Sequence, residues 1–157
     1  MQYRKQIVMI AALTSVALTN TLFGHCEIPC GIYDDRARVE MIREHSRTIE
    51  KSMNKIRELQ EQEDKSYNQL VRWITNKEEH ANKIQKIVYQ YFMNQRIKVV
   101  SQEDNEDYET YVQQITLLHR MLVQAMKCKQ TTDTAHIENL RTLVDRFENS
   151  YFDEHKH

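Results

Sequence analysis

Apolar side chains recur every three, four or seven residues in four stretches of this chain, a pattern typical of one buried helix face. The first stretch contains Val39, Ile42, Ile49, Met53, Ile56 and Leu59. The second contains Leu70, Trp73, Ile74, Ala81, Ile84, Ile87, Val88, Tyr91 and Phe92. The third contains Tyr111, Val112, Ile115, Leu118, Leu122 and Met126, and the fourth Ile137, Leu140, Leu143, Val144, Phe147 and Tyr151.

Polar breaks separate these stretches at residues 64–66, 101–107 and 131–134. Ser66 followed by Gln69 predicts a capping box at the start of the second helix. The whole chain has only two glycines and one proline, so it offers little material for tight turns. Four amphipathic helices joined by short connections predict an all-α, up-down four-helix bundle over about residues 35–152.

Residues 1–24 differ from the rest of the chain. Arg4 and Lys5 precede an apolar run from Ile7 to Leu18, and a short exit ends at Gly24, as in a secretory signal. The apolar run is shorter than the roughly 20 residues that span a bilayer. We expect a cleaved leader and an exported, periplasmic or secreted product with no membrane association after cleavage. An uncleaved membrane anchor is the alternative.

Charge and glycine content exclude two classes of function. The formal net charge of −1 argues against a nucleic-acid binder, which needs a clear basic excess. Glycine occurs only at Gly24 and Gly31, so the chain cannot form a Gly-rich phosphate loop.

The segment that follows Gly24 reads HCEIPCGIY and carries the candidate chemistry. If cleavage makes His25 the first residue, its α-amine, with a pKa of about 7.7 to 8.0, becomes a metal ligand. The amide nitrogen and thiolate of Cys26 and the thiolate of Cys30 complete a plane of nitrogen and sulfur donors, and the His25 imidazole can approach axially. This donor set suits Ni(II) or Cu(II), although thiolates also attract Cu(I) and Zn(II).

The motif His-Cys-x-x-Pro-Cys-Gly-x-Tyr at a processed N-terminus resembles the nickel hook of nickel-containing superoxide dismutases. The likeness continues through Asp34-Asp35 and Ala37-Arg38-Val39-Glu40, and more diffusely through residues 72–81 and Tyr91-Phe92. It implies an oxidoreductase domain over residues 25–157, with the hook at 25–33. The implied reaction converts superoxide to dioxygen and hydrogen peroxide by Ni(II)/Ni(III) cycling. The implied assembly is a homohexamer, and a maturation protease would expose His25.

The resemblance also implies a role for each matching residue. The metal ligands would be His25, Cys26 and Cys30. Tyr33, with His25, would be catalytic, lying over the open face of the metal to exclude competitors and order water or substrate. Supporting positions around the ligands would be Glu40, which holds the axial imidazole, Tyr91, Glu27 and Pro29.

One position departs from the family pattern. Where the family often places an arginine that supports the axial imidazole, this chain has Asn76. The neighbouring Lys77 would point about 100° away from it on a helix. Candidates for steering the superoxide anion are Lys77, Lys83 and Lys86.

Other interpretations remain open at this stage. Cys26 and Cys30 could form a disulfide, or bind zinc with histidine. An exported protein that sequesters copper, nickel or zinc without turnover is the alternative function. The location is cytoplasmic if residues 1–24 are only a maturation propeptide. Cys128 is expected to be a buried or half-buried free thiol, and surface or capping roles are expected for His45, His80, His119 and His136.

Overall fold

The computed structural model describes residues 33–103 and 105–154, which contain helices and no strand. The chain divides into two units, Met1–Tyr33 and Asp34–His157, and the second unit holds every helix of the described residues. The elements are α2 (Asp35–Glu61), α3 (Tyr67–Lys86), the π-helix η1 (Ile87–Arg96), α4 (Asn105–Gln130) and α5 (Ala135–Glu154). The all-α prediction is confirmed.

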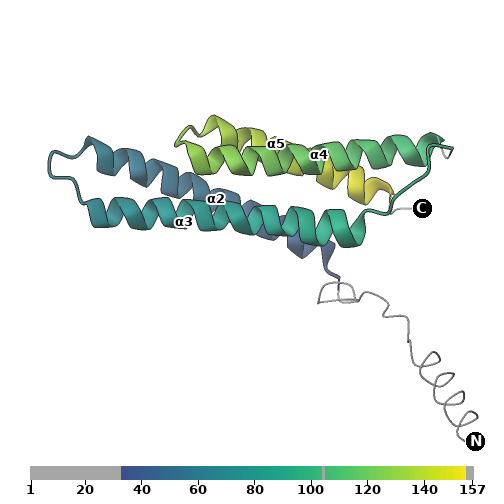
Figure 1. The fold of residues 1–157 in the computed structure, drawn as a ribbon, viewed down its shortest axis with the longest axis horizontal. Coiled ribbons are helices and arrows are strands. Elements are labelled where there is room, and N and C mark those ends of the chain that lie inside the picture. Colours follow the sequence, from purple (N-terminus) through teal and green to yellow (C-terminus); the bar gives the residue numbers. More distant parts are fainter. Residues whose placement is uncertain (1–32, 104, 155–157) are drawn as a thin grey trace, which may run out of the picture. The chain divides into compact units, whose positions relative to one another are not determined.

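The helices form the predicted up-down bundle. Helix α3 packs on α2, α4 packs on α3 and η1, and α5 packs on α4 and α2. Helices α2, α3, α4 and α5 run in alternating directions, and η1 continues α3 in the same direction (Figure 1). The start of α2, the end of η1, the start of α4 and the end of α5 therefore meet at one end of the bundle, called here the α2-start end. Within residues 33–103 and 105–154, no helix is long and apolar enough to cross a membrane.

The breaks after α2 and α4 lie where they were predicted, whereas the connection between η1 and α4 spans residues 97–104, earlier than the predicted 101–107. One predicted cap is wrong. Asp34 caps α2, because its carboxylate accepts a hydrogen bond from the Ala37 amide at 2.9 Å. Ser66 precedes α3 as expected, yet its side chain makes no cap hydrogen bond. Its backbone has ψ of 81°, and the Tyr67 amide bonds the Lys65 carbonyl instead. The extended geometry that a capping box needs is therefore absent.

The predicted apolar faces of the first and last helices form the core. All six predicted positions of each are buried. Most of them pack with residues of α3, η1 and α4 such as Phe92 and Leu118, whereas Ile56 and Leu59 form a smaller cluster with Leu70 of α3. In α4 the buried stripe is shifted from the prediction. Val112 and Met126 are exposed, whereas Leu117, Met121, Ala125 and Cys128 are buried. Apolar residues occupy more than one face of α4, so periodicity alone selected the wrong neighbours.

Cys128 lies fully buried in this core as a free thiol, as predicted. Burial raises its pKa to about 11, although the nearby Lys77 ammonium acts in the opposite direction. The thiol is therefore protonated at neutral pH.

Lys77, a residue of α3, caps the C-terminus of α4 with its side chain. Its side chain is buried, with 3% exposure, and its ammonium donates to the carbonyls of Cys128, at 2.8 Å, Lys129 and Thr131, at 3.1 Å. These carbonyls lie at the C-terminus of α4, where a positive charge is favourable. Burial lowers the pKa of Lys77, but three acceptors satisfy all three of its protons.

We predict that Lys77→Met lowers the free energy of unfolding by about 1.5 to 3 kcal/mol, because hydrogen bonds to a charged group are lost and buried carbonyls lose their partner. Lys83→Met, on the exposed side of the same helix, should change it by less than about 0.5 kcal/mol. Urea unfolding of both variants measures the difference. Equal effects would show that the buried ammonium contributes no net stability.

Candidate functional site

The predicted ligands lie outside the described residues. This applies to His25, Cys26 and Cys30, and also to Glu27 and Pro29. The chemistry of the donor set can still be tested against nickel: an amine, a backbone amide nitrogen, two thiolates and an imidazole are the nitrogen and sulfur donors that suit Ni(II). Three other predicted residues, Tyr33, Glu40 and Tyr91, are described. Tyr33 is exposed, at 39%, and directly precedes the Asp34 cap of α2.

A carboxylate in the first turn of α2 collects four side-chain donors at the α2-start end. Asp35 accepts hydrogen bonds from the Tyr91 hydroxyl at 2.6 Å and the Tyr151 hydroxyl at 2.8 Å. Arg96 forms a two-pronged ion pair with it, Nε to Oδ1 at 2.9 Å and Nη2 to Oδ2 at 2.8 Å. This Asp35 cluster joins α2 to η1 and α5, two residues after the predicted hook ends.

The π-helix explains how two of these donors reach the same carboxylate. Tyr91 and Arg96 are five residues apart, and in an α-helix they would point about 140° away from each other. In η1 each backbone carbonyl accepts a hydrogen bond from the amide five residues later, which widens the turn and brings such residues toward the same side of the helix. The second helix was predicted to be one regular helix, and this change of backbone is what that prediction lacked.

The cluster sets the protonation of its members. Burial alone would raise the pKa of Asp35, but hydrogen bonds from Arg96, Tyr91 and Tyr151 outweigh it and lower the pKa. Burial, together with the bond to Asp35, raises the pKa of Tyr91 to about 12. At neutral pH the Tyr91 oxygen therefore keeps its proton and donates it to the Asp35 carboxylate.

Glu40 belongs to a second polar network, on the side of α2 that faces α5. Its carboxylate accepts a hydrogen bond from Arg43 at 2.8 Å. Arg43 also bonds Asp145 at 2.8 Å and Glu148 at 2.5 Å, both on α5. The Glu40 side chain remains largely exposed, with 63% of its surface accessible, so it is open to a further partner.

The position that departs from the family pattern is occupied by a structural residue. Asn76 donates a hydrogen bond to the Ser52 hydroxyl at 2.9 Å, which links α3 to α2. Lys77 is bound to the end of α4, so it is unsuitable for steering superoxide and leaves the set of candidates. Lys83 and Lys86 are both exposed.

Arginines rather than lysines provide the cationic groups nearest Tyr91. Arg96 shares Asp35 with Tyr91, and the Arg38 guanidinium lies 5.0 Å from the centre of the Tyr91 ring. The position of Arg38 beside Asp35 could have been predicted from the sequence, because Arg38 lies about one helical turn after Asp35 on α2. No sequence signal indicated Arg96, since its placement depends on the π-helix.

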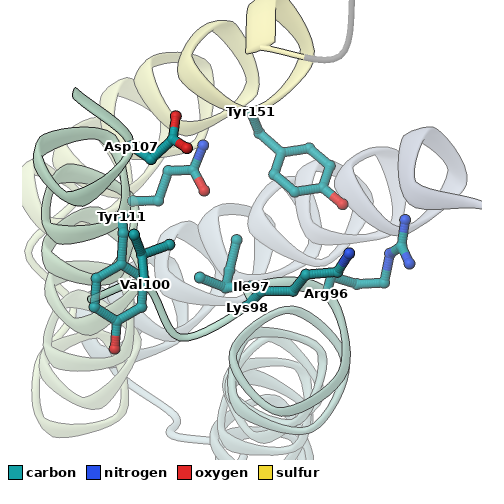
Figure 2. Close-up of a pocket in the computed structure, with 8 residues that line it drawn as sticks. Arg96, Ile97, Lys98, Val100, Asp107, Tyr111 and Tyr151 are labelled. Atoms are coloured by element: carbon teal, nitrogen blue, oxygen red, sulfur yellow. The ribbon is translucent and has the colours of Figure 1, made fainter. Parts of the chain in front are cut away.

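A pocket of about 280 Å³ adjoins the Asp35 cluster on the side of α4. Figure 2 shows Arg96 and Tyr151 on one side of it, with Asp107 and Tyr111 of α4 opposite. Lys98 adds a second cation. The lining thus carries both signs of charge, and it favours no single class of ligand.

We predict that Asp35→Asn lowers the free energy of unfolding by about 1.5 to 3 kcal/mol at neutral pH, because the charged partner of Arg96 is lost. Asp34→Asn is the matched control, since asparagine caps a helix as well as aspartate does, and it should change stability by less than about 0.5 kcal/mol.

The same pair tests the pH dependence. The folded-state pKa of Asp35 is lower than its ordinary value of 3.8, so its stabilisation is present above that value and is lost as the pH falls further. Denaturant unfolding between pH 7 and pH 3 should show a smaller acid loss for Asp35→Asn than for Asp34→Asn. An identical loss would contradict the assigned role of the cluster.

Comparison with known proteins adds the family. No curated protein and no solved structure matches the chain significantly. The family model described as nickel-containing superoxide dismutase matches residues 20–156, which include the hook motif and every helix of the described residues. The chain therefore belongs to the nickel-containing superoxide dismutase family, and is a nickel-dependent oxidoreductase that acts on superoxide.

Proposed function

We propose that removal of residues 1–24 exposes His25, and that residues 25–33 then form a hook that binds nickel. The observation that carries the proposal is the HCEIPCGIY motif inside a family match that extends over residues 20–156. The ligands are the α-amine and imidazole of His25, the amide nitrogen and thiolate of Cys26, and the thiolate of Cys30. Each ligand group must be deprotonated or neutral to bind the metal, so the affinity for nickel decreases as the pH falls.

The reaction consumes two superoxide anions and two protons and yields one dioxygen and one hydrogen peroxide. Anionic thiolates and a deprotonated amide make Ni(III) accessible, so nickel bound there supplies the one-electron chemistry between Ni(II) and Ni(III). Glu27 and Pro29 support the loop between the ligands, and Tyr33 limits access to the open face and orders water or substrate. Glu40 holds the His25 imidazole, a role suited to its exposed carboxylate.

The Asp35 cluster fixes the backbone that directly follows such a hook in the sequence. Asp34 caps α2 and Asp35 is held by groups from η1 and α5. Residue 33, the last of the hook, is therefore followed at once by backbone whose position is set by three elements. Tyr91 belongs to the Asp35 cluster and keeps its hydroxyl proton. We therefore assign Tyr91 to positioning and hydrogen bonding rather than to proton transfer.

The remaining parts of the proposal concern maturation and assembly. Residues 1–24 act as a leader cut by a maturation protease, and residues 25–157 are the mature domain. The product is exported, either periplasmic or secreted, or cytoplasmic if the leader serves maturation alone. Mature chains assemble into a homohexamer, as in the family that the hook resembles.

We predict that the protein purified from a nickel-supplied host has an intact mass starting at His25 and one nickel per chain. Cys26→Ser and Cys30→Ser should each abolish nickel binding and dismutase activity. Cys128→Ala is the matched control, because its thiol is buried in the core, and it should keep both.

Three results separate the alternatives. A nickel-loaded protein without turnover would support the sequestering function instead. A metal-free protein with a Cys26–Cys30 disulfide, which takes up no nickel after reduction, would overturn the hook. A chain that retains Gly24 but binds nickel and turns over would contradict the role of the His25 amine.

A further inference from the structure

Two histidines meet between α2 and α3, and neither belongs to the Asp35 cluster or to the predicted hook. The Nδ1 atoms of His45 and His80 lie 3.2 Å apart, and the rings are nearly perpendicular, at 81°, with centroids 4.9 Å apart. Surface or capping roles were predicted for both. The structure instead places them half-buried and in contact, and neither lies at a helix terminus.

The core holds this pair in place. On α2, His45 lies between the buried residues Ile42 and Ile49, beside the buried Ser46. On α3, His80 precedes the buried Ala81. Because α2 and α3 pack along their length, the two imidazoles are brought to the edge of one shared interface. Their contact follows from helix packing and requires no flexible loop.

The spacing of the two nitrogens fits a shared metal ion. Zinc binds histidine nitrogen at about 2.0 to 2.1 Å, so two imidazoles on one tetrahedral ion have nitrogens about 3.3 Å apart. The observed separation is 3.2 Å. A direct hydrogen bond between the rings also fits this distance, but it requires one ring to carry its proton on Nδ1 and the other on Nε2.

The surrounding charges favour a cation. Glu44 on α2 acts electrostatically on both histidines, and Glu79 on α3 acts on His80. Lys83 opposes them and acts on both. Two carboxylates thus face one ammonium around the pair. Burial, and for His45 also the neighbouring His80, lowers the pKa of each imidazole, which keeps both rings in the neutral form that metals bind.

We propose that His45 and His80 bind one divalent transition-metal ion of the zinc or copper class through their Nδ1 atoms, with no ligand from the hook. Among the residues placed by the structure, no group of three or more histidine, cysteine, aspartate or glutamate side chains is already gathered for a metal. Water therefore completes the coordination, and the nearby Glu44 carboxylate contributes only a favourable charge. Such an ion cross-links α2 to α3 and stabilises the folded bundle by mass action.

The test uses the mature chain with nickel already bound, and zinc alone as the probe. Equilibrium dialysis followed by metal analysis counts zinc per chain in addition to nickel. The wild type should bind one zinc ion whose binding depends on His45 and His80. His45→Gln and His80→Gln should each weaken that binding by about tenfold or more, since even losing a residue that only supports a ligand costs about 10–100-fold.

His119→Gln is the matched control, because His119 is an exposed histidine on α4, and it should leave the zinc count and affinity unchanged. Zinc bound elsewhere, for example by the histidines at residues 155 and 157, remains bound in His45→Gln and His80→Gln. The zinc count of these variants is therefore subtracted from that of the wild type. Zinc should also raise the melting temperature of the wild type and of His119→Gln, but not of His45→Gln or His80→Gln.

Nitrogen-15 NMR of the wild type keeps the test decisive if a glutamine variant fails to fold. Zinc binding should shift the Nδ1 resonances of His45 and His80 together, at one zinc per chain. Unchanged Nδ1 resonances in the presence of zinc, or zinc binding that is indifferent to both substitutions, would overturn the site. The pair would then be a hydrogen bond between two neutral rings.

Discussion

The arrangement of the α2-start end of the bundle depends on one carboxylate, that of Asp35. Asp35 is buried enough that an unpaired charge would be costly, and it is compensated by Arg96 and two tyrosine hydroxyls. These donors come from η1 and α5, so the start of α2 cannot move without breaking bonds to both. The proposed hook thus leaves the bundle from a position that the core determines.

The π-helix is the backbone feature that makes this cluster possible. An α-helix through Ile87–Arg96 would bury Tyr91 and Phe92 as the sequence predicts, but it would direct Arg96 elsewhere. π-helical turns are rare and frequently lie at functional sites. In this chain they coincide with the residues that surround Asp35. The ion pair with Asp35 and an aromatic core around Phe92, Phe147 and Tyr151 hold these turns in place.

How much the sequence reveals depends on the range of the interaction. Helix faces such as Val39, Ile42 and Ile49 repeat at local spacing, so the four helices and their order were predictable. The Asp35–Arg96 pair, the Lys77 cap of α4 and the contact of His45 with His80 each join residues that are 35 or more positions apart in the sequence. No local pattern encodes them. Glu40 and Tyr91 were found only through the resemblance, and their contacts came from the structure.

Cys128 has a consequence for an enzyme whose product is hydrogen peroxide. Peroxide attacks thiolates far faster than thiols, and a thiolate that is oxidised repeatedly cannot be restored. With its pKa raised to about 11 inside the core, Cys128 offers peroxide almost no thiolate. Oxidation is then directed to exposed or metal-bound sulfur, and the thiol in the centre of the bundle is spared.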